Sequence, residues 1–176
     1  RNRLMLPVID VRGDVVGFGS RVLDKSEPKY MNTPETLTYS KRRILYGMNL
    51  AKKSKRSNII LCEGNLDVVT LHQAGFDNAV ASMGTALTVE QTRLLSRFTK
   101  ELVLCYDNDN AGKIATERAL QILNGSEFSV KVLQLPRRLV DGEYIKQDAD
   151  DFIKLQGPDA FERLLNGSEN GVEFRM

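Results

Sequence analysis

The sequence is poor in the side chains that several common kinds of active site require. It has a single histidine, His72, so it lacks the imidazoles of a His-rich zinc site. A Ser-His-Asp triad would have to use that histidine, which stands in a helix-like stretch. The two cysteines, Cys62 and Cys105, stand in apolar, strand-like runs, which predicts buried thiols in a reducing cytoplasm. Histidine and cysteine chemistry are therefore disfavoured.

Long apolar runs and glycine-rich phosphate loops are missing as well. No apolar run approaches the roughly 18 residues of a membrane-spanning helix, and no signal peptide opens the chain. No P-loop is present, and the GFG at positions 17–19 is not a dinucleotide fingerprint because position 22 is valine. Any binding of phosphate must therefore rest on side chains or on a metal ion.

What the chain does have is charge, and its two signs are unevenly placed. The 176 residues are 41% apolar and 27% charged, which is typical of an ordinary soluble globular protein with one full core. Residues 1–57 contain 13 Lys/Arg and 5 Asp/Glu, for a net charge of +8. Residues 58–176 contain 12 Lys/Arg and 18 Asp/Glu, for a net charge of −6. This asymmetry predicts a polyanionic partner held beside a cation site.

The basic front half has the pattern of a small β-rich unit. Two apolar runs flank Arg12-Gly13-Asp14, which predicts a hairpin closed by an Asp/Gly turn. A proline-containing loop over 27–36 follows, and the basic stretch 42–56 predicts a helix. The back half instead alternates the two kinds of element. Strands are predicted over 58–62, 78–82, 102–106 and 129–135, and helices over 67–73, 88–98 and 111–123.

That alternation predicts an α/β fold with a parallel sheet, whose ligands bind at the carboxyl ends of the strands. Glu63 follows the first of these strands, and Asp107 and Asp109 follow the third. The two aspartates are one residue apart, so their side chains can point the same way. Carboxylates gathered at one edge repel one another unless a cation sits among them, and Mg²⁺ is the natural occupant. Three further aspartates extend the pattern: Asp67, Asp148 and Asp150.

These motifs resemble those of a known family. The segments CEGNLDVV, ASMGTALT, YDNDNAG and QDADDFI resemble the successive motifs of the Toprim domain. The segments GFGSRVL, EPKYMNTPET and KRRILYG resemble the N-terminal part of the RNA polymerase core of bacterial replicative DNA primases of the DnaG type. The resemblance covers nearly the whole chain. It implies a Toprim fold with a mostly parallel central sheet flanked by helices, preceded by a small α+β N-terminal subdomain.

The domain boundaries implied by the resemblance are 1–57 for the basic N-terminal subdomain, 58–140 for the Toprim domain and 141–176 for an acidic motif with a helical extension. The implied activity is that of a nucleotidyltransferase, which makes short RNA primers from ribonucleoside triphosphates on single-stranded DNA. The implied metal is Mg²⁺, with Mn²⁺ able to substitute for it.

Residue roles follow from the same motifs. Glu63 would be a metal ligand or a general acid/base, and Asp107 and Asp109 would be the main metal ligands. The acidic patch would be completed by Asp67, Asp148 and Asp150. Contacts to template or triphosphate are implied for Arg21, Lys29, Asn32 and Lys41.

The chain also departs from the family pattern. Asn108 replaces a glycine, which puts the local backbone in question because glycine tolerates a positive φ better than asparagine does. Asn65 replaces an aromatic residue, and Ala149 replaces a proline. The start without an initiator methionine, and the absence of a zinc ribbon and of a helicase-binding C-terminal domain, predict a fragment of a cytoplasmic enzyme whose partner is the replicative helicase.

Other functions remain open at this level. A Toprim nuclease or a topoisomerase-like phosphodiester transferase would use the same carboxylates, although no tyrosine is marked as a topoisomerase nucleophile. A non-catalytic Toprim module that binds DNA or a protein would keep the acidic edge for structural reasons. A response-regulator receiver would need a lysine at a later strand end, and VLQLP offers none.

Overall fold

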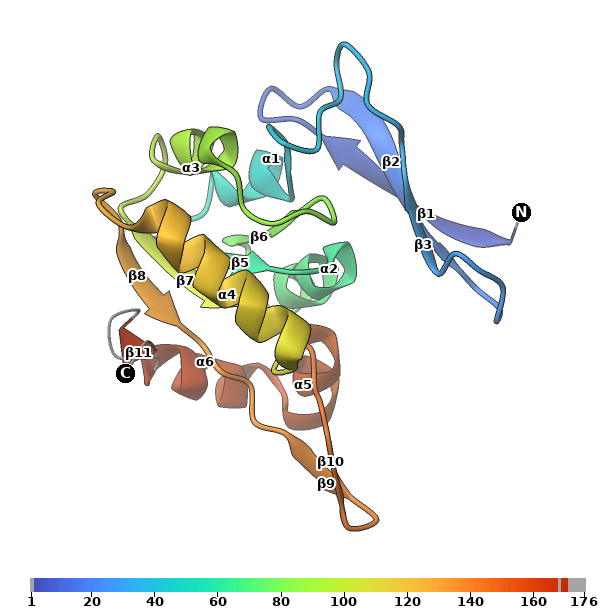
Figure 1. Cartoon of the computed structure of the whole chain (residues 1–176), viewed down its shortest axis with the longest axis vertical. Helices are drawn as coiled ribbons and strands as arrows, with labels where there is room; N and C mark the ends of the chain where they lie inside the picture. Colours follow the sequence, from blue (N-terminus) through green and yellow to red (C-terminus); the bar gives the residue numbers. More distant parts are fainter. Residues whose placement is uncertain (1, 168, 171–176) are drawn as a thin grey trace.

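The computed structural model describes residues 2–167 and 169–170, which form three sheets (Figure 1). A six-stranded sheet in the order β11-β8-β7-β5-β6-β4 forms the centre. A three-stranded sheet, β1-β2-β3, lies beside it, and the hairpin β9-β10 projects away from it at the other end of the molecule. The central strands are β4 (Leu45–Tyr46), β5 (Asn58–Cys62), β6 (Ala79–Ser82), β7 (Glu101–Cys105), β8 (Ser129–Val132) and β11 (Glu169–Asn170).

The four strands from β5 to β8 run parallel, as the alternation of strands and helices predicted. β4 and β11 pair antiparallel at the two edges. The predicted strand over 129–135 ends at Val132, although Leu133 and Leu135 remain buried. β5 lies between β6 and β7, so the residues that follow β5 and β7 meet at one edge of the sheet.

Helices cover both faces of the central sheet, and the helices predicted over 67–73, 88–98 and 111–123 are confirmed to within a few residues. One face carries α2 (Asn65–Gln73), α5 (Ala149–Gln156) and α6 (Pro158–Asn166). The other carries α1 (Met48–Ala51), α3 (Val89–Leu95) and α4 (Asn110–Leu123). Within the described ranges, no helix combines the length and the apolar character needed to cross a membrane.

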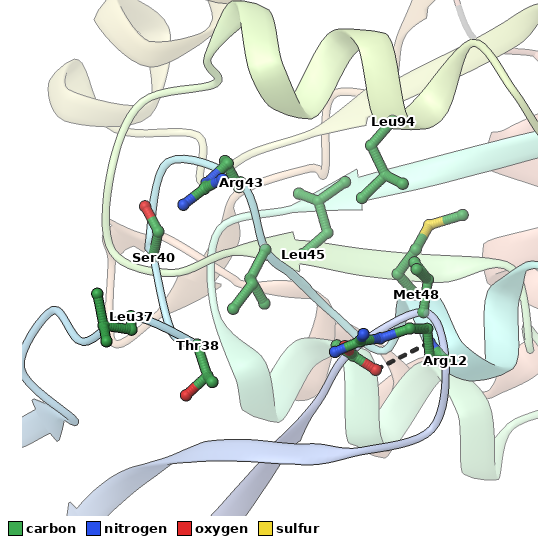
Figure 2. A pocket seen from close by; sticks show the side chains of 11 residues that line it. Arg12, Leu37, Thr38, Ser40, Arg43, Leu45, Met48 and Leu94 are labelled. Atoms are coloured by element: carbon green, nitrogen blue, oxygen red, sulfur yellow. Dashed lines mark hydrogen bonds and ion pairs between the residues drawn. The ribbon is translucent and has the colours of Figure 1, made fainter.

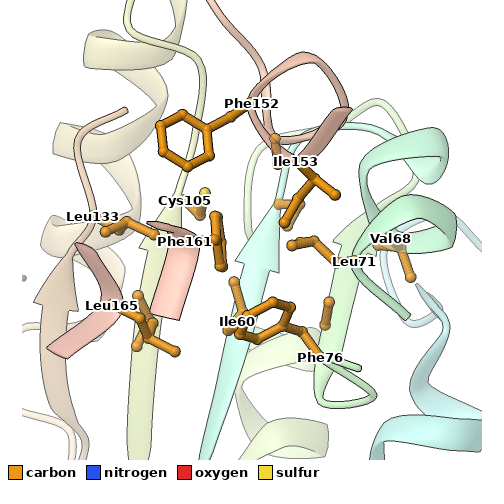
Figure 3. Close-up of a cluster of buried hydrophobic side chains, with 14 of the residues drawn as sticks. Ile60, Val68, Leu71, Phe76, Cys105, Leu133, Phe152, Ile153, Phe161 and Leu165 are labelled. Atoms are coloured by element: carbon orange, nitrogen blue, oxygen red, sulfur yellow. The ribbon is translucent and has the colours of Figure 1, made fainter. Parts of the chain in front are cut away.

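The face under α2, α5 and α6 is held by a cluster of aromatic and aliphatic side chains (Figure 3). Phe76 and Phe161 stack edge to face with ring centroids 4.8 Å apart, and Phe152 packs against the same ring. Cys62 and Cys105 are buried, unpaired thiols, as predicted. This packing fixes α5 and α6 against the sheet and thereby positions the acidic segment that begins α5.

The small sheet is the predicted hairpin with a third strand added. β1 (Arg3–Ile9) and β2 (Val15–Val22) pair antiparallel, and β3 (Tyr30–Asn32) joins β2 on its other side. The turn is closed by Asp10, whose Oδ1 accepts the backbone N–H groups of Arg12, Gly13 and Asp14 at 2.8, 3.1 and 3.1 Å. Gly13 supplies the positive φ of 104° that this turn requires.

The helix predicted over 42–56 is wrong. Leu45 and Tyr46 form the edge strand β4, and α1 spans only Met48–Ala51. Gly47 separates them with a φ of 80°, and a Cβ at that position would lie 2.7 Å from Cγ1 of Val68. The helical periodicity of this stretch did not determine its structure, because tertiary packing overrides local preference. Leu45 and Tyr46 pair with β6 instead, which buries Leu45 in the sheet.

A third cluster joins the small sheet to the central one. Val8 of β1 packs with Tyr39, Ile44 and Met83, all of them buried. Met83 lies in the loop after β6, at the carboxyl edge of the central sheet. The basic sheet is therefore held close to the edge at which the candidate carboxylates stand.

Candidate functional site

The first group of carboxylates lies at the ends of β5 and β7. These strands pair in parallel with Cys62 opposite Cys105, so Glu63 and the residues after β7 are neighbours. The backbone N–H of Asp107 donates to Oε2 of Glu63 at 3.3 Å. Partial desolvation raises the pKa of Glu63, and the negative charge of Asp107 raises it further. The sequence prediction that these two segments meet is confirmed.

Asp107 and Asp109 differ in environment although they are one residue apart. Asp109 is the N-cap of α4, where its Oδ1 accepts the N–H of Gly112 at 2.8 Å, and this hydrogen bond lowers its pKa. Burial raises the pKa of Asp107, and Lys146 opposes that rise. The two carboxylates nevertheless point the same way, because both contact one ammonium group.

That ammonium belongs to Lys146, which sequence reasoning missed. Its Nζ lies 3.2 Å from Oδ2 of Asp107 and 2.9 Å from Oδ2 of Asp109. Both contacts raise the pKa of Lys146. The lysine directly follows β10 (Glu143–Ile145), the second strand of the hairpin begun by β9 (Arg138–Val140). The available signal was its position two residues before Asp148 in an acidic segment.

Asn108 and Gly112 fix the conformation of the segment that connects β7 to α4. Asn108 does not adopt the positive φ of a glycine; among the described non-glycine residues, only Asn2 and Asp141 do. Its side chain instead donates to the carbonyl of Leu135 at 3.0 Å and ties this loop to the segment after β8. Gly112 is packed so closely that a Cβ there would lie 1.9 Å from the carbonyl oxygen of Asp107.

The second acidic group lies between the N-termini of α2 and α5. Asp67 is buried, and its oxygens accept the N–H groups of Gly64 at 3.0 Å and of Asp150 at 3.2 Å. Burial raises its pKa to about 7, and the charge of Asp148 adds to that effect. The hydroxyl of Thr70 donates a hydrogen bond to Oδ1 of Asp150. Oδ2 of Asp150 forms an ion pair with Nζ of Lys154 at 2.5 Å. Asp67 therefore braces α2 against α5.

Asp148 begins α5 as its N-cap and accepts the N–H of Asp151 at 2.8 Å. Carboxylate oxygens of Asp148, Asp150 and Asp151 all lie within 4.8 Å of one another, which is close enough to hold a metal ion. Asp151 was missed, although it stands in the same acidic run as the other two. The charge of Asp148 also raises the pKa of Asp107, so the two acidic groups lie within electrostatic reach.

The basic candidates divide between two places. Arg21 and Lys29 flank the ring of Tyr30 in the small sheet, at 5.9 and 5.6 Å from its centroid. Burial raises the pKa of Tyr30, and the charges of Asp67, Asp148 and Asp150 add to it, so this ring lies near the acidic residues of α2 and α5. The amide of Asn32 donates to the carbonyl of Met83 at 3.3 Å. Lys41 lies outside this sheet, with its backbone bonded to Glu35 and Gln91.

Two cavities lie near these elements. One of about 310 Å³ lies between the β1–β2 turn, the loop over 37–45 and the helices α1 and α3, and Arg12 and Arg43 are among its lining residues (Figure 2). None of the six carboxylates predicted from the sequence lines it. A second, of about 260 Å³, adjoins Glu63 and is bounded by the loop after β6 and by Ile114 and Arg118 of α4. Of these two cavities, the second opens beside a candidate carboxylate, that of Glu63.

Comparison with known proteins agrees with this geometry. The family model described as Toprim-like matches residues 60–153, and that of the DNA primase catalytic core, N-terminal domain, matches residues 1–52. The DNA primase of Clostridium acetobutylicum is 44% identical over all of the chain, and that of Haemophilus influenzae is 41% identical over 99% of it. The chain covers only 28% and 29% of these two relatives.

Solved structures give the same result. The Escherichia coli primase catalytic core matches with a TM-score of 0.86 at 38% identity, over 99% of this chain and 55% of that one. A DnaG primase catalytic domain bound to single-stranded DNA matches with a TM-score of 0.86 at 37% identity, over 99% and 54%. The two family models together describe a Toprim domain preceded by a primase-specific unit. The chain belongs to the DnaG-type DNA primases, and the predicted Toprim fold is confirmed.

The close approach of Gly112 to Asp107 yields a first prediction. Gly112→Ala should lower the free energy of unfolding by about 2–3 kcal/mol, because its Cβ forces the Asp107 backbone to move. Urea denaturation measures this change. Lys113→Ala, at the next and exposed position of α4, should change it by less than about 0.5 kcal/mol. Equal stability of the two variants would show that α4 shifts freely.

The buried Asp67 yields a pH dependence. Its folded pKa of about 7 exceeds the unfolded value of roughly 3.9, so the folded state binds the proton more tightly. Stability from this group is therefore highest below about pH 4 and falls as the pH rises to about 7. Relative to Asp67→Asn, the wild type should lose about 2–4 kcal/mol across that window. Denaturation curves recorded at several pH values in metal-free buffer test this prediction. Asp159→Asn, which changes an exposed aspartate, is the control. Parallel profiles of stability against pH for Asp67→Asn and the wild type would contradict the prediction.

Proposed function

We propose that this chain forms the central part of an enzyme that makes short RNA primers from ribonucleoside triphosphates on single-stranded DNA. The observation that carries the proposal is the meeting of Glu63, Asp107 and Asp109 at one sheet edge, beside a basic sheet. Membership of the DNA primase family and likeness to a catalytic domain bound to single-stranded DNA support it. Residues 1–52 match the N-terminal domain of the DNA primase catalytic core, which favours a primase over a Toprim nuclease, a topoisomerase or a non-catalytic module.

The residues fit a divalent cation. The donors are all carboxylate oxygens, which hard cations prefer, and a cationic group already lies between two of them. Glu63, Asp107 and Asp109 would hold Mg²⁺, with Mn²⁺ as a substitute, and Asp67, Asp148 and Asp150 would complete the acidic patch. When bound, such an ion supplies charge neutralisation at the phosphates and activates the attacking hydroxyl.

The protein's own side chains would divide the remaining work. As the alternative to binding the metal, Glu63 would accept the proton of the primer 3′-hydroxyl, because a carboxylate with a raised pKa is a better base. Arg21, Lys29 and Asn32 would hold the template backbone or the triphosphate beside the acidic edge, and Lys41 would extend the basic surface toward α3. Tyr30, whose ring centroid lies 5.9 Å from Arg21 and 5.6 Å from Lys29, offers a ring face beside these cations.

The chain spans less than a third of the curated relatives that it matches, so the activity of the whole protein is part of the proposal. We propose the replicative helicase as a partner, contacted through a C-terminal domain outside this chain, and the cytoplasm as the compartment. The domain division proposed from the motifs is 1–57, 58–140 and 141–176, and β4 and α1 of the first segment pack into the central sheet and its core.

The metal assignment predicts the effect of Asp109→Asn. Asparagine is also a good N-cap, so α4 should keep its start while one metal-binding charge is lost. We expect near-total loss of labelled short RNA made from ribonucleotides and single-stranded DNA with Mn²⁺, and an unchanged circular dichroism spectrum. Asp77→Asn, in the exposed turn after α2, serves as the control. Full synthesis by Asp109→Asn would exclude this metal site.

The basic candidates predict a salt dependence. Lys29→Ala and Lys41→Ala should each weaken single-stranded DNA binding for every sequence alike, since phosphate contacts carry no sequence information. The slope of log K against log salt should shrink by roughly 0.7 per lost contact. Lys100→Ala, at the opposite edge of the sheet, should leave the slope unchanged. Because Lys29 and Lys41 lie apart, a slope that changes in only one variant assigns the contact to that lysine.

A further inference from the structure

Lys146 lies where a divalent cation would have to lie if Asp107 and Asp109 held it through the same oxygens. Its Nζ contacts one oxygen of Asp107 and one of Asp109, and these are the carboxylates proposed as main ligands. An ammonium group and a metal ion compete for those oxygens, and their positive charges repel each other when both lie at contact distance. Either the lysine moves when an ion binds, or the ion binds elsewhere.

The surroundings of Lys146 allow it to move. Its side chain is 55% exposed, whereas those of Asp107 and Asp109 are 22% and 34% exposed. All three residues of β10, which precedes it, are exposed, and among the described strands the hairpin pairs only with itself. In Figure 1 this hairpin projects away from the central sheet. The carboxylates, by contrast, stand on the fixed ends of β7 and α4.

Charge balance explains why a lysine would stand there. Asp107 is subject to the repulsion of Asp109 and of Asp148. Without a counter-charge, that repulsion would oppose folding of the strand ends. Lys146 supplies one positive charge and two charge-assisted hydrogen bonds. It stabilises the metal-free protein, and by the same contacts it competes with any cation for the oxygens.

We propose that Lys146 is a built-in counter-ion that exchanges with the divalent cation between Asp107 and Asp109 and keeps the affinity of the site for that cation low. The proposal rests on the metal site of the proposed function and adds a positioning residue to it. Lys146 leaves the two carboxylates when they take a metal ion and returns when the ion departs. The metal-free site is thus never left as bare, mutually repelling carboxylates.

Direct Mn²⁺ binding tests the exchange. Free Mn²⁺ is counted by electron paramagnetic resonance during titration of the wild type, Lys146→Met, Lys100→Met and Asp109→Asn. Methionine keeps the length and apolar stem of lysine without its charge. Lys146→Met should bind Mn²⁺ about tenfold more tightly, equivalent to about 1.4 kcal/mol. Lys100→Met removes the same charge and an ion pair with Glu127 at the far end of β7, and should change the affinity by less than about twofold.

The outcomes separate the two proposals. If Asp109→Asn weakens binding but Lys146→Met leaves it unchanged or weaker, the counter-ion exchange is wrong and the metal site stands. If Asp109→Asn binds Mn²⁺ as tightly as the wild type, the metal site fails and the exchange fails with it. Equal tightening by Lys100→Met would reduce the effect to net charge and also overturn the exchange.

A second measurement uses the wild-type protein and does not depend on how the variants fold. Acetylation of lysines, read by mass spectrometry, should label Lys146 slowly without metal and faster when saturating Mg²⁺ releases its amine. Lys100, paired with Glu127, is the internal control and should not respond to Mg²⁺. Labelling of Lys146 that is unchanged by Mg²⁺ at saturation would overturn the proposal.

Discussion

The mutual repulsion of carboxylates at one sheet edge is the constraint around which the rest of this structure is arranged. Parallel pairing of β5 with β7 brings Glu63 beside Asp107, and the start of α5 adds Asp148 to the same field. The negative charge of each carboxylate is balanced by a different partner. Asp109 accepts a helix N–H, Asp67 accepts two backbone N–H groups, and Lys146 bridges the pair after β7. A fold that concentrates negative charge must supply such partners locally.

The two acidic groups are therefore not equivalent. The oxygens of Asp67 are committed to the backbone, and its burial favours the protonated form more strongly than at any other described carboxylate with a resolved shift. Its contribution is to hold α2 and α5 together at the rim of the site. Oxygens of Asp107 and Asp109 face the exposed ammonium group of Lys146, and Glu63 lines the cavity beside α4. In the proposed acidic patch, Asp67 would therefore act mainly by placing the N-termini of α2 and α5 beside the carboxylates that follow β5 and β7.

Much of this could be predicted from local sequence. The strands that precede Glu63 and Asp107 are short apolar runs, and the rule that parallel strands end at a common edge was enough to bring those residues together. The partners of the carboxylates were harder to foresee. Lys146 lies 39 and 37 residues from the aspartates it contacts, on an exposed hairpin with no apolar alternation to mark it. β4 was missed because a strand of two residues is too short to show an alternating pattern. The feature that interrupts the helix predicted over 42–56 is the positive φ of Gly47, which the sequence does not reveal.

The edge strand β4 has a consequence for how such domains can be exchanged between proteins. It belongs by sequence to the basic front half, yet its backbone completes the central sheet by pairing with β6. A unit cut out from residue 58 onward would leave β6 with a bare row of N–H and C=O groups, and sheet edges of that kind pair with other chains. A transplantable module therefore begins before Leu45 and carries Gly47 and α1 with it. The boundary of the central sheet and the boundary between the basic and acidic halves therefore lie at different places in this chain.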